Sequence, residues 1–97
     1  MTKHETFLSV LPEECRTLKI EPRNRMALKP FFIGSTVWVV LITDMPEQAD
    51  KAWCMTNSEF RAIEPKHETR VRWIRENMKP LLASAPNPPK PHQASLF

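Results

Sequence analysis

The side chains best suited to catalysis or metal binding in this 97-residue chain are its three histidines and two cysteines. His4, His67 and His92 are scattered, and none has a carboxylate or thiol at the spacing of a metal site or a catalytic helix. Cys15 and Cys54 lie far apart and lack the neighbouring cysteine that a zinc knuckle or a redox pair needs. The sequence therefore predicts no metal site, no catalytic residues and a protein that is not an enzyme.

Cofactor chemistry is limited by the single glycine, Gly34. Loops that hold nucleotide phosphates need several glycines, so that backbone N–H groups can approach the ligand. We therefore expect no cofactor.

The formal charge of +3 arises from interleaved acidic and basic residues, a pattern that permits nonspecific nucleic-acid binding without requiring it.

The best candidate for a binding site is one side of a helix predicted over residues 65–79. At about 100° per residue, one stripe of this helix should face the core, and it carries Val71, Ile74, Met78 and, at its edge, His67. Trp73 points away from this stripe, and an exposed tryptophan beside arginine is typical of a protein-binding hot spot. The predicted partner-binding group comprises Lys66, Arg70, Trp73 and Asn77. The alternative is that a second element covers Trp73, because tryptophan is usually mostly buried.

A second class of function, DNA binding, would use the basic side chains of the same helix. These are Arg70, Arg72, Arg75 and Lys79. Glu68 and Glu76 lie beside them, and an acidic group that faces phosphate lowers affinity. The residue pattern therefore favours docking to a protein, with a small basic DNA-binding protein as the alternative.

The core that must position this helix is expected around the apolar run of residues 31–42. Its β-branched and aromatic residues favour strands, and Gly34-Ser35 is a candidate two-residue hairpin turn. The run is shorter than the roughly 20 residues that cross a bilayer. A second helix is predicted over residues 46–55, because the run Thr43-Asp44-Met45-Pro46-Glu47 has a capping side chain, an early proline and an acid in the first turn. Its inner face would carry Met45, Ala49, Ala52 and Trp53.

These elements predict an α+β fold, a small single domain in which a short β-hairpin is covered by two or three helices. Residues 1–82 would form the domain. Residues 83–97 would form an extended tail rich in proline, because Pro86, Pro88, Pro89 and Pro91 remove amide donors and favour polyproline geometry. No secretory signal precedes the cysteines, so we expect reduced thiols in a cytoplasm.

Over its whole length, the chain resembles the second class of anti-RecBCD protein of lambdoid phages. The likeness extends from Met1-Thr-Lys-His to the proline-rich tail, and includes the segment Trp73-Ile-Arg-Glu-Asn-Met-Lys-Pro80. The resemblance implies a phage protein, active in the host cytoplasm, that binds the RecC subunit of the host recombination nuclease RecBCD. It would redirect double-strand-break processing toward phage recombination. The resemblance also implies a host peptidyl-prolyl isomerase as a companion, and it transfers no site residues.

The Glu64-Pro65 bond is the candidate for prolyl isomerisation. An isomerase needs an accessible X–Pro bond, and Pro65 lies between a short turn and a predicted helix, where a cis bond would re-aim that helix. The alternative is an ordinary trans proline at the first helical position.

The segment Gln93-Ala-Ser-Leu-Phe97 resembles the Gln-x-Ser/Asp-Leu-Phe motif by which bacterial proteins bind the replicative sliding clamp. In that resemblance Leu96 and Phe97 fill an apolar pocket and Gln93 forms a hydrogen bond at its rim. Ala94 stands where leucine is usual, which should weaken binding. The alternative is a frayed tail whose last residues fold back on the domain.

We predict that a fluorescent peptide of residues 83–97 binds purified sliding clamp in a saturable manner, because a proline spacer presents the motif clear of the domain. Fluorescence anisotropy measures the binding. Equal binding by a peptide carrying Leu96→Ala and Phe97→Ala, or no saturation, would end this hypothesis.

Overall fold

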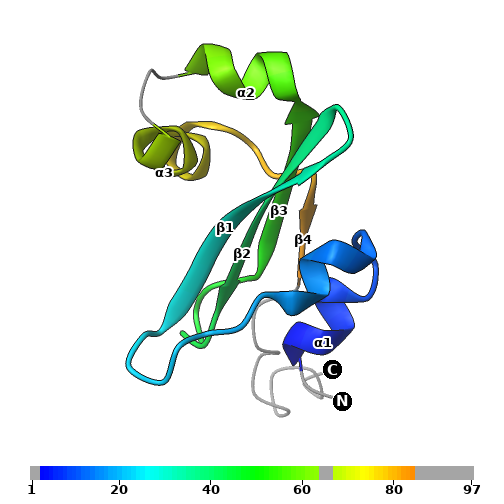
Figure 1. Ribbon diagram of the computed structural model, residues 1–97. Coiled ribbons are helices and arrows are strands. Elements are labelled where there is room, and N and C mark those ends of the chain that lie inside the picture. The colour runs from blue at the N-terminus through cyan, green and yellow to red at the C-terminus, as the bar shows by residue number, and fades with distance from the viewer. Residues whose placement is uncertain (1–2, 64–66, 85–97) are drawn as a thin grey trace, which may run out of the picture.

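The computed structural model describes residues 3–63 and 67–84, which form a four-stranded antiparallel sheet with helices on both faces (Figure 1). The strands lie in the order β1-β2-β3-β4. The elements along the chain are α1 (Lys3–Leu8), the 3-10 helix η1 (Glu13–Thr17), β1 (Met26–Ile33), β2 (Thr36–Thr43), β3 (Lys51–Thr56), α2 (Asn57–Ile63), α3 (His67–Asn77) and β4 (Leu82–Ala83). The predicted α+β class is confirmed.

The predicted hairpin and its turn are confirmed, and both strands are longer than expected. Ile33 of β1 pairs with Thr36 of β2, which leaves Gly34-Ser35 as a two-residue turn. Among the described residues Gly34 alone has a positive φ, +62°, the pattern of a type II′ turn with glycine first. Pro30 has no N–H group to donate. In the register set by the turn, its nitrogen faces the open edge of β1 and not β2, so the ladder between the two strands loses no hydrogen bond.

Strand β2 separates two cores because its side chains alternate between the faces of the sheet. Val40 and Ile42 belong to the N-terminal core, which packs beneath α1 and η1. The other buried members of this core are Phe7, Leu8, Leu11, Cys15, Leu18, Phe31 and Ala52. Opposite it lies the C-terminal core, beneath α2 and α3, formed by Val37, Val39, Leu41, Trp53, Met55, Phe60, Val71 and Ile74. The fold is therefore a sheet between two helical layers.

The helix predicted over residues 46–55 is wrong. The Pro46-Glu47 signal marks a turn, in which the Gln48 N–H donates to the Met45 carbonyl, and the chain then enters strand β3. Ala52 and Trp53, placed together on one helical face by the prediction, point to opposite faces of the sheet and join different cores. The strand forms because the second edge of β2 is available for backbone pairing. The hydrogen bonds and side-chain packing of that pairing outweigh the local preference for a helix.

The predicted helix of residues 65–79 is confirmed as α3, over His67–Asn77. Val71 and Ile74 are buried in the C-terminal core and Met78 packs against it, as the helical period predicts. The His67 side chain lies outside what the structure describes. Trp53, 2% exposed, donates its indole N–H to the Met78 carbonyl over 2.9 Å. This bond ties the end of α3 to the centre of the sheet.

Helix α2 begins with a reciprocal capping box. The Thr56 hydroxyl accepts the Glu59 N–H at 3.1 Å, and the Glu59 carboxylate accepts the Thr56 N–H at 2.8 Å. These hydrogen bonds lower the pKa of Glu59. The box turns the chain from β3 directly into α2, which places Phe60 over the C-terminal core.

Strand β4 continues the sheet past the predicted end of the domain at residue 82. Ala83 pairs with Lys51, and the Ser84 N–H donates to the Asp50 carbonyl over 2.9 Å. Residues 85–97 lie outside the described part. In the ranges that are described, no helix has both the length and the apolar composition of a membrane span.

We predict that Val39→Asp unfolds the domain, since Val39 is 0% exposed within the C-terminal core. An unpaired charge there should cost roughly 4 kcal/mol or more, a large part of the 5–15 kcal/mol that stabilises a typical domain. Thermal melting followed by circular dichroism measures the effect. Ser35→Asp, which adds the same charge at an exposed turn, is the control, and an unchanged melting temperature for Val39→Asp would contradict the core assignment.

Candidate functional site

The predicted binding side of α3 is accessible. Trp73 is 39% exposed, and the Asn77 side-chain amide donates to the Trp73 carbonyl over 3.0 Å. Arg70 lies one turn before Trp73 on the same side of the helix, which makes the two side chains neighbours. The structure thus brings together Arg70, Trp73 and Asn77, while Lys66 lies outside the described residues.

The surface extends from α3 to strand β1 through Phe32, which sequence reasoning missed. Phe32 is 54% exposed, and its ring meets the ring of Phe60 edge to face, with centroids 5.6 Å apart at 82°. The Arg70 guanidinium lies over the Phe60 ring, 5.5 Å from its centroid. The alternation of side chains along a strand could have predicted this position of Phe32. Phe31 and Phe32 must face opposite sides of the sheet, and Phe31 lies in the N-terminal core.

A pocket of about 380 Å³ lies where these side chains meet. It is lined by Phe32, Asn57, Phe60, Arg61 and Arg70, and is called here the aromatic–arginine pocket. Its described lining residues include two arginines and one asparagine, and none of them is acidic. Such a site can bind a carboxylate or phosphate through arginine and an apolar group through the rings.

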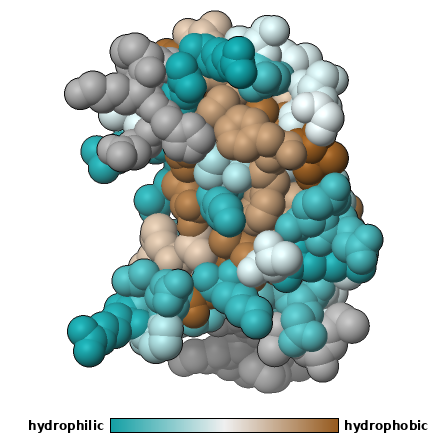
Figure 2. Space-filling model, viewed as in Figure 1, coloured by the Kyte–Doolittle hydropathy of each residue, from teal (hydrophilic) through white to brown (hydrophobic). Residues whose placement is uncertain are grey.

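Apolar surface is also visible at the level of the whole molecule. Figure 2 shows one face, on which apolar side chains run along the strands between the helical parts, with hydrophilic groups above and below. The exposed large apolar residues of the described chain are Val10, Phe32, Trp73, Leu81 and Leu82. Phe32 lies on β1 and Trp73 lies on α3, and residues of both elements pack in or against the C-terminal core.

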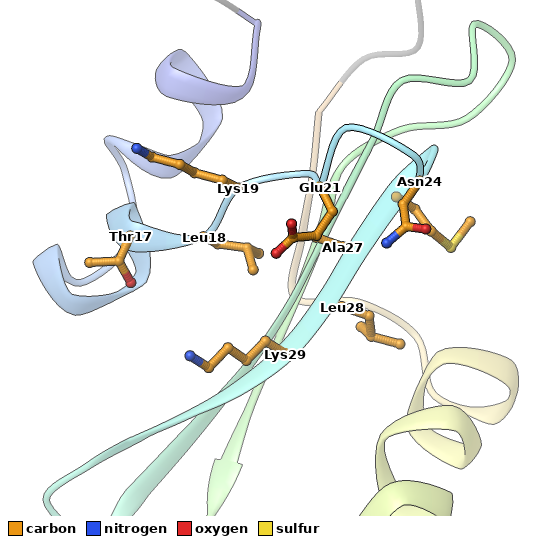
Figure 3. Close-up of a pocket in the computed structure, with 9 residues that line it drawn as sticks. Thr17, Leu18, Lys19, Glu21, Asn24, Ala27, Leu28 and Lys29 are labelled. Carbon is orange, nitrogen blue, oxygen red and sulfur yellow. The ribbon is translucent and has the colours of Figure 1, made fainter.

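A second groove, of about 570 Å³, lies between β1 and the segment that follows η1. Figure 3 shows the side chains of Leu18 and Glu21 pointing toward each other across it, and those of Lys19 and Lys29 extending away to one side. Its charged side chains have both signs, and the Thr17 hydroxyl at its edge donates to the Glu14 carbonyl. The groove therefore has no strong preference for ligands of one charge.

His4 forms a partly buried polar cluster that sequence reasoning also missed. Its Nδ1 lies 3.0 Å from an Asp50 carboxylate oxygen and its Nε2 lies 2.8 Å from an Asp44 carboxylate oxygen. Asp50, which is 0% exposed, also accepts the Thr43 N–H at 3.0 Å. Both ring nitrogens face carboxylates, so neither is left to take a proton from a nucleophile. The arrangement stabilises the fold and does not resemble a catalytic triad.

The charges around His4 change its proton affinity. Burial by itself would lower the pKa of His4, but hydrogen bonds to Asp44 and Asp50, together with their negative charges, outweigh burial and raise the pKa. A neutral imidazole has one N–H and can donate to one carboxylate, whereas imidazolium donates to both. The cluster therefore favours protonated His4.

The two cysteines are free, and their environments disfavour the thiolate. Burial, with the nearby charge of Glu14, raises the pKa of Cys15 to about 11, and burial, with Glu59, raises the pKa of Cys54. A thiol is a poor nucleophile while it stays protonated.

In the parts of the chain that are described, no cluster of three or more His, Cys, Asp or Glu residues could hold a metal ion.

Comparisons of the chain with protein-family models, curated proteins and solved structures found no match. Pro65 and the tail residues Gln93, Leu96 and Phe97 lie outside the described residues, so isomerisation and clamp binding stay predictions from the sequence. The site that the structure itself defines is the surface shared by Arg70, Trp73 and the aromatic–arginine pocket.

We predict that the stability of the protein falls as the pH rises above about 6.5. The pKa of folded His4 is raised above its ordinary value of 6.5, so its stabilising effect is complete below that pH and is lost as the pH passes through the raised pKa. Urea unfolding across this range measures the slope.

His4→Gln should abolish this slope, whereas Asp44→Asn, which removes one of the two carboxylate partners, should reduce it. His4→Gln should also lower the free energy of unfolding at pH 6 by about 1–3 kcal/mol, because buried Asp50 loses a charged partner. A His4→Gln variant with the wild-type slope would show that another group causes the pH dependence.

Proposed function

We propose that this protein is a non-enzymatic phage modulator that binds the RecC subunit of host RecBCD. In this role it acts in the host cytoplasm and redirects double-strand-break processing toward phage recombination. The identity of the partner comes from the resemblance of the whole chain to anti-RecBCD proteins. The observation that supports docking is an exposed tryptophan beside arginine on a well-anchored helix.

The anchoring of α3 suits it to binding a large partner. Val71 and Ile74 hold its inner face in the C-terminal core, and the hydrogen bond from Trp53 to Met78 fixes its end. A side chain on such a platform loses less conformational freedom on binding than one on a loose segment. Trp73 is therefore presented in a defined position, with Arg70 and Phe32 on the same surface.

A small DNA-binding protein is the competing function. Arg72 and Arg75 are exposed on α3, and Glu76, exposed one turn after Arg72, would face the same phosphates. An electrophoretic shift with random duplex at physiological salt separates the two functions. Micromolar or tighter binding by the protein alone would favour the DNA-binding function.

We predict that Trp73→Ala weakens binding to purified RecBCD by about 2 kcal/mol or more, about 30-fold. The substitution removes an aromatic ring that, in the proposed complex, is buried from water against the partner. Biolayer interferometry with RecBCD immobilised through RecC measures the affinity. The melting temperature should change little, since Trp73 is 39% exposed.

Val10→Ala is the matched control, because Val10 is an exposed apolar residue, 67% accessible, that follows α1 on the opposite face of the sheet. It should bind as the wild type does. Undiminished binding by stably folded Trp73→Ala would exclude this side of α3 as the contact, and joint loss of folding and binding would mark Trp73 as a core residue. Failure of the wild-type protein to bind RecBCD would overturn the proposed function.

A further inference from the structure

We infer that the open edge of β1 binds an extended segment of another protein, which adds a further strand to the sheet and carries acidic residues at alternate positions. The segment lies in the groove between β1 and the chain that follows η1 (Figure 3). This inference goes beyond the proposed function and does not depend on it, because none of the described residues that line the groove belongs to α3.

The backbone of β1 alternates between β2 and the open edge of the sheet. The Asp44 N–H donates to the Arg25 carbonyl over 2.9 Å, so Arg25 and, by alternation, Ala27 turn their backbone groups toward β2. Met26 and Leu28 must therefore direct their N–H and C=O groups to the other side, where β1 has no neighbouring strand in the described sheet. These two residues offer an incoming strand two donors and two acceptors.

The outward backbone groups are accessible. The groove, of about 570 Å³, is lined on one side by the consecutive residues 26–29, so its open space lies directly along this edge. Within the described residues, no hydrogen bond outside the sheet engages the backbone of Met26 or Leu28. An unpaired strand edge is a template on which an extended peptide can form main-chain hydrogen bonds.

Pro30 limits the length of this site. Its nitrogen also faces the open edge and has no hydrogen to donate, so a ladder that begins at Met26 is interrupted there. A proline on an edge strand also protects a sheet from unlimited pairing with other chains. The edge therefore offers a short docking site, residues 25–29.

The side chains of residues 25–29 indicate the charge of the segment. Arg25, directly before β1, and Lys29 share one face of the strand and are both exposed. Neither has a carboxylate partner among the described residues, and the Lys29 ammonium lies over the Phe31 ring, 5.3 Å from its centroid. Because opposite charges directly across an antiparallel pair stabilise it, the segment should carry Asp or Glu opposite Arg25 and Lys29.

The other positions of the segment follow from the same register. Met26 and Leu28 point to the opposite face, where they pack, partly buried, against the C-terminal core. Apolar β-branched residues opposite them extend that packing. Glu21, on the facing wall, is the one acid among the described lining residues, so the central position, opposite Ala27, should be uncharged. The segment is therefore acidic, apolar, polar, apolar and acidic in turn, and antiparallel to β1 like the other strand pairs described.

The backbone of this edge favours a protein segment over a nucleic acid. Phosphate groups are also attracted to arginine and lysine, but they accept hydrogen bonds and cannot satisfy the outward carbonyl groups of Met26 and Leu28. A peptide backbone both donates and accepts, with the spacing of the edge.

The direct test is an NMR titration of the ¹⁵N-labelled full-length protein with the peptide acetyl-Glu-Val-Thr-Val-Glu-amide. We expect saturable binding. At saturation the Met26 and Leu28 amides should exchange with solvent about tenfold more slowly, because they become hydrogen-bonded. The Ala27 and Lys29 amides, which already face β2, are the internal controls and should change less than about twofold.

Three matched peptides separate backbone pairing from charge. N-methylation of both valines removes the N–H groups that face β1, and it should weaken binding about tenfold. N-methylation of the threonine, whose N–H faces away, should weaken binding less than about twofold. The peptide acetyl-Lys-Val-Thr-Val-Lys-amide, which places like charges opposite Arg25 and Lys29, should bind about fivefold more weakly.

Variants of the protein test the same charge contact. Lys29→Gln should weaken the acidic peptide about threefold, because it removes one of the two opposite charges. Arg72→Gln, which removes an exposed cation on α3, is the matched control and should leave peptide binding unchanged.

No saturable binding of the acidic peptide, or equal binding by the valine-methylated peptide, overturns the inference. Slow exchange of the Met26 and Leu28 amides in the free protein also overturns it. In that case the occupant is a second copy of the chain if protection rises with protein concentration, and a segment of the same chain if it does not. Shifts of the Arg25 and Lys29 signals with oligothymidylate, and none with the peptide, overturn the inference in favour of nucleic acid.

Discussion

The burial of β2 on both faces is the constraint on which the rest of the structure depends. Its edges are satisfied by β1 and β3, while Val40 and Ile42 complete the N-terminal core and Val37, Val39 and Leu41 complete the C-terminal core. A strand covered on both faces reads as a continuous apolar run, because neither set of alternating side chains meets water. Each helical layer therefore depends on the same strand.

The C-terminal core also supports the proposed docking surface. Phe60 connects the two: its ring is buried among core residues, and it contacts Phe32 and Arg70 at the surface. Trp53 contributes in the same way by holding Met78 at the end of α3. Exposed binding groups supported by packed residues lose little freedom when a partner binds, which favours affinity.

Polar contacts as well as apolar packing hold α1 and η1 on the sheet. Asp50 lies between β2 and β3, binds His4 of α1 and accepts the Thr43 N–H, while its own N–H donates to the Ser84 hydroxyl. A buried carboxylate is tolerated only when such partners replace water. This cluster explains why a fold with a small core can contain a fully buried acid.

The sequence by itself determined the features that follow from local periodicity and turn chemistry: the Gly34-Ser35 hairpin, the buried stripe of α3 and the outward position of Trp73. Only the tertiary structure decided that Lys51–Thr56 is a strand, because the free edge of β2 supplies backbone partners that outweigh a local helix signal. It also decided the pairing of His4 with Asp50, 46 residues apart, and the meeting of Phe32 with Arg70. These contacts join elements distant in the chain, and no spacing along the sequence encodes them.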